Sequence, residues 1–157
     1  MAKDIMERKL SEFGDMTLEE FIELIRNEFS KMIPEDCMQE CNIKAEVTSM
    51  LKELGIPANI KGYGYLRDAI IYALQEPKAL HGIVSVLYAE VARKNNTTPS
   101  KTERAIRIAI QIAWERGNID RIHEIFGYTI DINRSRPTNS EFIAMLVDSL
   151  KMKYKLG

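Results

Sequence analysis

Three charged side chains near the start of one predicted helix have the types and spacing to bind a nucleic acid. In the stretch 97–114, TTPSKTERAIRIAIQIAW, Glu103, Arg104 and Arg107 share one side, because successive helical residues turn by about 100°. Arginine can donate two hydrogen bonds to guanine O6 and N7, and a carboxylate can accept one from the cytosine amino group. The plainer interpretation is an ion-paired helix face that points into solvent. The rest of the chain must decide between them.

These residues belong to a polar stripe that begins at the helix N-terminus. The stripe spans an arc of roughly 100° and comprises Ser100, Glu103, Arg104, Arg107 and Gln111. The opposite side carries Ala105, Ile106, Ala109, Ile112 and Ala113. In a helix-turn-helix, the N-terminal end of the second helix meets the base edges in the major groove. The stripe therefore has the right position for reading bases.

The role of Glu103 depends on where this helix starts. If Ser100 is the N-cap, Glu103 completes a capping box and folds back onto the Ser100 amide. If Thr98 is the N-cap, Pro99 occupies the first helical position, where its missing N–H costs nothing. We favour Thr98, which leaves Glu103 free to face a groove.

Apolar residues recur at helical spacing through the chain, and no segment alternates long enough to require a sheet. We therefore expect an all-α protein. The predicted helices occupy about 15–33, 36–54, 61–77, 81–96, 99–115, 119–126 and 140–155. The helix at 81–96 ends in Asn95 and Asn96, which with Thr97 and Thr98 make about four polar residues between its apolar positions and the helix that starts at 99. This is the spacing of a helix-turn-helix.

Glycine and proline mark the expected helix ends. Thr17 with Glu20 fits a capping box at the start of the first helix, and Gly55 with Pro57 ends the second. Pro77 and Gly117 are further stop signals. The Gly62-Tyr63-Gly64 step follows no strand and lacks a third glycine, so we interpret it as a turn and not as a nucleotide-binding loop.

Composition limits the class of protein. Of the 157 residues, 45% are hydrophobic and 29% charged, which predicts a folded chain. No run of about 18 apolar residues occurs, and the N-terminus lacks the apolar stretch of a secretion signal, so we expect a cytoplasmic protein with no membrane partner. Cys37 and Cys41 are expected to be reduced thiols, because a structural zinc site usually needs four ligands. We expect no metal and no cofactor.

Charge is distributed unevenly along the sequence. Residues 1–44 carry 6 basic and 11 acidic side chains, net -5, and residues 45–157 carry 16 and 12, net +4. The segment 93–107 has five basic side chains against one acidic, namely Arg93, Lys94, Lys101, Arg104 and Arg107 against Glu103. Such a local excess attracts a polyanion.

Four blocks of sequence, in order, resemble one known family. They are IKGYGYLRDAI, NNTTPSKTERAIRIAIQIAWERGNID, IFGYTI and RPTNSEFIAM. Over about residues 45–157 the chain resembles the C-terminal effector domain of the sporulation-initiation response regulator, the stage zero sporulation protein A family. The resemblance implies a six-helix domain built around a helix-turn-helix, which binds double-stranded DNA at a short G·C-containing box and regulates transcription.

The resemblance also implies site residues. The family's DNA-contacting positions correspond to Ser100, Lys101, Glu103, Arg104, Arg107 and Lys155. Lys101 replaces an arginine, which keeps the charge and loses the planar fork, and Ile108 stands where the family usually has histidine. The segment 117–130 corresponds to the one that faces the RNA polymerase sigma subunit, and Arg121, His123 and Glu124 are larger and more charged than the family's residues there.

Family members carry a receiver domain of about 120 residues in front of this domain, and the 44 residues here are too few to fold one. We therefore expect phosphorylation control to be absent from this chain. The acidic helical arm at 1–44 has three open roles: an oligomerisation element that makes a homodimer, a partner-binding helix, or a further helix packed on the core.

Two functions of different classes remain. One is a sequence-specific DNA-binding regulator, and the other is a protein-interaction module that pairs with a full-length regulator or with RNA polymerase. Glu103, Arg104 and Arg107 together favour the first, because an interaction module has no use for that set. An enzyme is not expected, since the sequence shows no catalytic motif or phosphate-binding loop.

Overall fold

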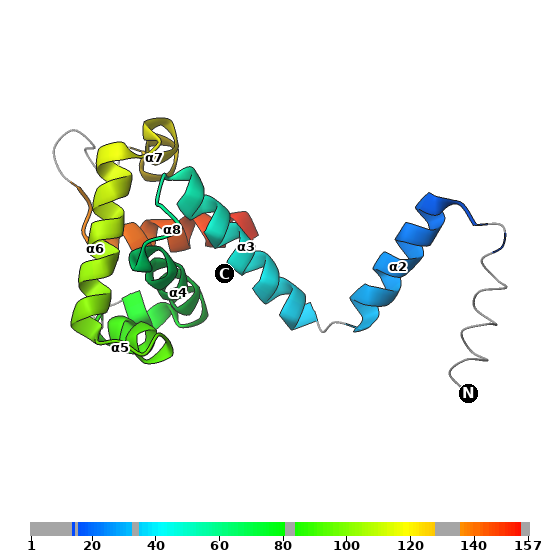
Figure 1. Ribbon diagram of the computed structural model, residues 1–157, viewed down its shortest axis with the longest axis horizontal. Helices are drawn as coiled ribbons and strands as arrows, with labels where there is room; N and C mark the ends of the chain where they lie inside the picture. The colour runs from blue at the N-terminus through cyan, green and yellow to red at the C-terminus, as the bar shows by residue number, and fades with distance from the viewer. Residues whose placement is uncertain (1–13, 15, 33–34, 81–83, 128–135, 155–157) are drawn as a thin grey trace. The chain divides into compact units, whose positions relative to one another are not determined.

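The protein is all-helical in the computed structural model, which describes residues 14, 16–32, 35–80, 84–127 and 136–154 (Figure 1). The helices are α2 (Leu18–Met32), α3 (Glu35–Glu53), α4 (Lys61–Gln75), α5 (Val84–Lys94), α6 (Pro99–Arg116), α7 (Ile119–Phe126) and α8 (Asn139–Tyr154). A short 3₁₀ helix, η1 (Pro77–Leu80), follows α4 and was not expected from the sequence. No strand occurs in the described ranges, which confirms the all-α prediction.

The chain divides into two compact units, residues 1–42 and 43–157. The first contains α2, whose start has the predicted capping box. The Thr17 amide donates to Glu20 Oε2 at 2.9 Å, and the Glu20 amide donates to Thr17 Oγ1 at 3.3 Å. These bonds satisfy amide groups that the first helical turn leaves without partners.

The core of the second unit lies around α4, which packs against α5, α6 and α8. In Figure 1, α6 and α8 run on different sides of α4. The largest fully buried side chains come from all of these helices and include Leu66, Ile70, Leu87, Ile106, Ile110, Phe142 and Leu146. Phe126 of α7 packs between Trp114 and Phe142, with ring centroids 5.4 Å and 5.2 Å away. Aromatic burial thus fixes α7 against α6 and α8.

The Gly62-Tyr63-Gly64 step is helical, and its interpretation as a turn was wrong, because these residues lie in the first turns of α4. The reason is a close helix crossing. A Cβ atom on Gly62 would lie 2.2 Å from the Ala105 carbonyl oxygen and 2.9 Å from Ala109 Cβ, both on α6. Glycine is present at position 62 because the backbone of α6 occupies the space of a side chain.

The end of α3 is a Schellman motif at the predicted glycine. Gly55 has φ +85°, its amide donates to the Lys52 carbonyl at 3.0 Å, and the Ile56 amide donates to the Leu51 carbonyl at 3.1 Å. The predicted stop at Gly117 is also confirmed as the C-cap of α6. A Cβ on Gly117 would lie 2.2 Å from the Leu54 carbonyl oxygen, so the ends of α3 and α6 meet in backbone contact.

Four residues, 95–98, join α5 to α6, as the sequence predicts for a helix-turn-helix. Asn96 adopts φ 52°, the left-handed conformation that asparagine tolerates better than most residues. Asp68 of α4 anchors the turn to the core. Its carboxylate accepts hydrogen bonds from Lys94 Nζ at 3.0 Å and from Asn95 Nδ2 at 2.9 Å. The start of α6 is therefore fixed relative to the core.

We predict that a chain without residues 1–34 keeps the cooperative unfolding of the second unit. The buried hydrophobic side chains of the described residues all lie at or after Val47, so this deletion removes none of them. Thermal unfolding followed by circular dichroism would check this. Loss of a cooperative transition would mean that the arm is part of the core.

Candidate nucleic-acid interface

Thr98 is the N-cap of helix α6, as the sequence favoured. The Thr98 side chain accepts a hydrogen bond from the Lys101 amide at 3.3 Å, and Pro99 occupies the first helical position. The Thr98 carbonyl also accepts from Thr102 Oγ1 at 3.0 Å, which satisfies the hydroxyl of this fully buried residue. The capping box with Ser100 as N-cap is therefore wrong, and Glu103 has no capping role.

The polar stripe faces outward along the N-terminal half of α6. Of its residues, Ser100, Arg104, Arg107 and Gln111 are exposed and Glu103 is half-buried; Lys101, which follows Ser100 in the helix, is also exposed. On the opposite side, Ile106, Ala109 and Ala113 are fully buried. The helix therefore presents the predicted side chains to solvent at its N-terminal end.

Glu103 and Arg107 form an ion pair across one helical turn, with Glu103 Oε2 and Arg107 Nη2 3.7 Å apart. This is the plainer interpretation of the pattern, and it holds for these two residues. An i, i+4 pair on an accessible helix face contributes only about 0.3–0.5 kcal/mol. A pair of this strength orients the Arg107 side chain and still leaves it able to bind another group.

Arg104 is the exposed arginine of the set without such a pair. No carboxylate of the described residues lies within 4.0 Å of its guanidinium. Two other cations of the 93–107 cluster are engaged, because Arg93 pairs with Glu90 and Lys94 with Asp68, each at 3.0 Å. Within this cluster, Lys101 and Arg104 of α6 are therefore the cations without a carboxylate partner among the described residues.

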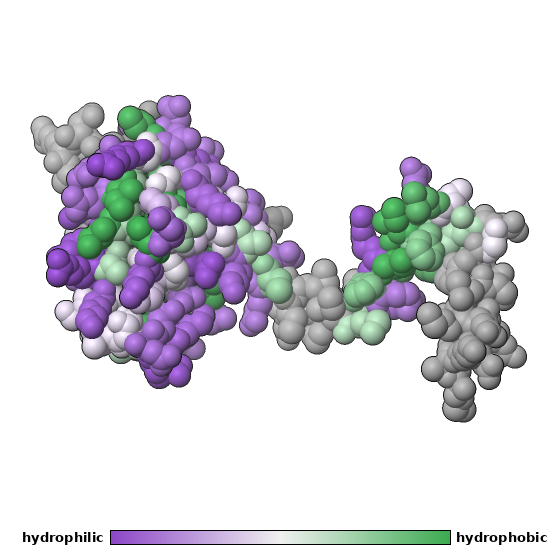
Figure 2. All heavy atoms as spheres, viewed as in Figure 1, coloured by the Kyte–Doolittle hydropathy of each residue, from purple (hydrophilic) through white to green (hydrophobic). Residues whose placement is uncertain are grey.

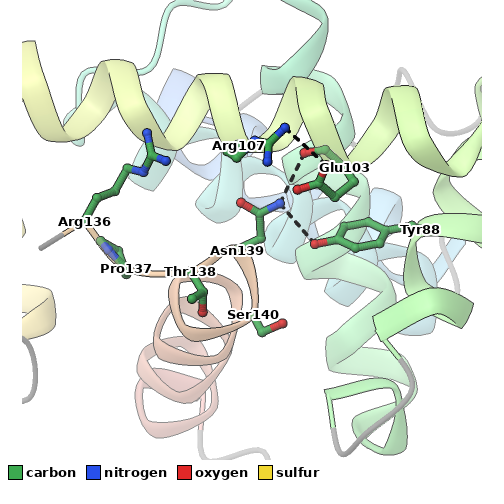
Figure 3. A pocket seen from close by; sticks show the side chains of 8 residues that line it. All are labelled: Tyr88, Glu103, Arg107, Arg136, Pro137, Thr138, Asn139 and Ser140. Carbon is green, nitrogen blue, oxygen red and sulfur yellow. Dashed lines mark hydrogen bonds and ion pairs between the residues drawn. The ribbon is translucent and has the colours of Figure 1, made fainter.

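Asn139, at the start of α8, links this helix to α5 and α6 (Figure 3). Its Nδ2 donates to the Tyr88 hydroxyl of α5 at 3.0 Å and to the Glu103 carbonyl of α6 at 3.2 Å. Burial raises the pKa of Tyr88 above its ordinary 10.0; the Asn139 bond lowers it, and the Glu103 charge raises it. The Tyr88 hydroxyl therefore stays neutral at physiological pH.

A cavity of about 440 Å³ opens beside this network. Its walls come from α5, α6 and the start of α8, and the lining residues are Tyr88, Glu103, Arg107, Arg136, Pro137, Thr138, Asn139 and Ser140. In Figure 3 the Arg136 side chain, from the segment before α8, points toward α6. Arg136 is exposed and brings a further guanidinium to the polar face of α6.

We predict that Asn139→Ala lowers the free energy of unfolding by about 1–2 kcal/mol, because two hydrogen bonds between helices are lost. Tyr88→Phe is the matched control, since it removes only one of them, and its effect should be about half as large. Urea unfolding of the two variants would measure both values. Equal stability of Asn139→Ala and the unchanged protein would contradict this role.

Ile108 is 44% exposed beside the stripe, at the position where the resemblance implied a histidine. Lys155, the sixth predicted contact, lies outside the described residues. Five of the six predicted DNA contacts therefore lie on α6, and the sixth, Lys155, is outside the part of the chain that the structure describes.

The segment implied to face the sigma subunit forms α7 in its described part, up to Gly127; residues 128–130 lie outside the described ranges. Arg121 is engaged in two ion pairs at 2.7 Å, with Glu53 of α3 and with Glu124. His123 and Glu124 are exposed, and Ile119 is 62% exposed. The accessible surface of α7 is therefore a large apolar side chain among polar ones.

Sequence reasoning missed three residues of this region: Tyr88, Asn139 and Arg136. Asn139 had a local signal, because Thr138 and Glu141 form a capping box, with the Glu141 amide donating to Thr138 Oγ1 at 3.2 Å. That T-x-x-E pattern predicts a helix that starts at 139. Tyr88 lies 51 residues from Asn139, and no local pattern reveals a contact between them.

None of the helices in the described ranges combines the length and the apolar character that crossing a membrane requires. Among the same residues, no group of three or more His, Cys, Asp or Glu side chains is placed to hold a metal ion.

A comparison with protein-family models matches residues 47–150 to the family described as sporulation initiation factor Spo0A C terminal. The match covers α4 to α7, α3 from Val47 onward and α8 up to Leu150. It spans well over half of the chain and includes the helix-turn-helix with its polar stripe. The chain therefore belongs to the Spo0A C-terminal family, and residues 47–150 form a DNA-binding domain of the sporulation-regulator type.

Proposed function

We propose that the unit at 43–157 is a sequence-specific transcription regulator that reads a short G·C-containing box with the N-terminal half of α6. One observation supports this most strongly: Ser100, Lys101, Arg104 and Arg107 are all exposed at the leading end of the second helix of a helix-turn-helix. That end of such a helix meets base edges in the major groove.

The exposed side chains suggest separate roles. Arg104 is unpaired among the described residues and suits a bidentate contact to guanine O6 and N7. Arg107 is held by Glu103 and suits a second base contact at the next turn of the helix, with Glu103 accepting from a cytosine amino group. Ser100, Lys101 and Arg136 suit phosphate contacts, which position the protein and carry no sequence information. We assign Lys155 to the same class on the family resemblance alone.

A salt titration tests the division of roles. Binding of the full chain to a G·C-containing box and to a scrambled duplex would be followed by fluorescence anisotropy from low to high salt. The unchanged protein should prefer the box at every concentration. Lys101→Ala should weaken both duplexes alike and reduce the salt slope by about one unit, because one phosphate contact is lost. Equal binding to both duplexes by the unchanged protein would contradict sequence-specific reading.

A second candidate function is contact with RNA polymerase through α7. The observation that favours it is Ile119, an exposed apolar side chain near exposed Asp120 and His123 in the segment that corresponds to the sigma-facing one. An Ile119→Ser variant should then keep its DNA affinity and lose transcriptional effect in a reconstituted assay with polymerase. Unchanged transcription would leave α7 with a structural role alone.

A further inference from the structure

Helix α2 of the first unit carries a row of large apolar side chains that point into solvent. Leu18 is 74% exposed, Ile22 48%, Ile25 39%, Phe29 61% and Met32 78%. Figure 2 shows apolar atoms gathered along this helix. Contiguous apolar surface of this kind marks an interaction site in a soluble protein.

The spacing of this row indicates the kind of partner. The five residues follow one another at steps of four, three, four and three, which is the alternation of the d and a positions in a coiled coil. Leu18, Ile25 and Met32 then occupy d positions, and Ile22 and Phe29 occupy a positions. Together these five side chains form an apolar seam along the helix. Such a seam packs against another helix with the same repeat. A single helix of 15 residues is only marginally stable in water, so α2 gains from a partner helix.

We propose that α2 pairs with α2 of a second copy of this chain, in antiparallel orientation about a two-fold axis. The proposal concerns the first unit and does not rest on the DNA-binding function of the second. In a two-fold interface each contact occurs twice, with the roles of the two copies exchanged. The seam is suited to this because it is self-complementary.

The charges beside the seam select the orientation and the register. Glu19 and Arg26 both occupy e positions, directly after Leu18 and Ile25, and e positions face each other across an antiparallel pair. When Ile22 of one copy shares a layer with Ile25 of the other, Glu19 of each copy faces Arg26 of its partner. This register makes two ion pairs and buries the centre of the seam.

The alternative arrangements lack this complementarity. A parallel pair sets the g position of one helix beside the e position of the next turn, which puts Phe21 next to Arg26 and forms no ion pair. If one helix of the antiparallel pair is shifted by one heptad relative to the other, Arg26 of one copy faces Arg26 of its partner, which is repulsive. The acidic residues Glu20 and Glu23 occupy f and b positions, on the side that stays in solvent in each case.

Sedimentation velocity of the full chain over a range of concentrations tests the proposal. We expect a dimer that Ile25→Asp dissociates. Glu19→Arg and Arg26→Glu should each weaken it by roughly tenfold, because two attractive pairs become repulsive. A one-to-one mixture of these two variants should recover the original affinity, since each Arg then faces a Glu again. Glu23→Arg makes the same charge change outside the seam and should have no effect.

Three results would overturn the proposal. One is a chain that stays monomeric at every concentration, which would mean that another part of the chain or a different protein covers the seam. Another is a dimer that Ile25→Asp leaves intact. The third is equal behaviour of Glu19→Arg and Glu23→Arg, or no recovery in the mixture, either of which would remove the antiparallel register.

Discussion

Replacing Arg104 with alanine is expected to lower the affinity for a G·C-containing box by about 1–3 kcal/mol, because a bidentate contact to guanine is lost. Arg104 is the better placed arginine for this role, because no salt bridge of the described residues includes it, whereas Arg107 pairs with Glu103 at 3.7 Å. Binding to a scrambled duplex should fall much less, because that complex depends on phosphate contacts. Anisotropy titrations on both duplexes at one fixed salt concentration measure the difference.

Two variants control this result. Arg104→Lys keeps the charge and loses the planar fork, so it should also lose preference for the box while it retains non-specific affinity. Gln111 lies two turns further along the same exposed stripe, so Gln111→Ala should change the affinity for either duplex little. If Arg104→Ala weakened the box and the scrambled duplex equally, Arg104 would be a phosphate contact and not a base-reading residue.

Replacing Gly62 with alanine is expected to destabilise the second unit by about 1–3 kcal/mol, the usual cost of forcing an extra group into a packed core. The added Cβ would lie 2.2 Å from the Ala105 carbonyl oxygen, and a backbone oxygen in a helix cannot move aside cheaply. Helices α4 and α6 would have to separate, which also shifts the polar face of α6. Thermal or urea unfolding measures the loss.

Gly64 provides a matched control two residues along the same helix. A Cβ there would meet nothing within 4 Å. Gly64→Ala should therefore stabilise the domain by about 0.5–1 kcal/mol, because alanine is the better helix former. If both alanine variants had the same sign and size of effect, the close crossing of α4 and α6 would not explain Gly62.

Local patterns were enough to predict the helices and the face of α6. The apolar period, the Thr17 and Thr98 caps and the stops at Gly55, Pro77 and Gly117 are all properties of residues within one or two turns of each other. The exposed positions of Ser100, Lys101, Arg104 and Arg107 follow from helical geometry once Thr98 starts the helix.

Contacts between distant elements could not be predicted in this way. The Gly62 step looked like a turn because the reason for the glycine is the backbone of α6, more than 40 residues further along the chain. The bonds from Asn139 to Tyr88 and to the Glu103 carbonyl also join three separate helices. The spacing of Glu103 and Arg107 fits an ion pair and a base-reading pair equally well, so the sequence alone does not separate the two.

Selection from randomised DNA tests most directly whether the N-terminal face of α6 reads sequence. The full chain and its Arg104→Ala variant would each select duplexes from a library with a fully random central segment, and the bound pools would be sequenced. We predict that the unchanged protein enriches a short box that contains G·C pairs, and that Arg104→Ala loses the preference at one of those positions while it keeps the others. Base reading by the α6 face would be contradicted if both proteins enriched the same box at every position. It would also be contradicted if the unchanged protein enriched no sequence.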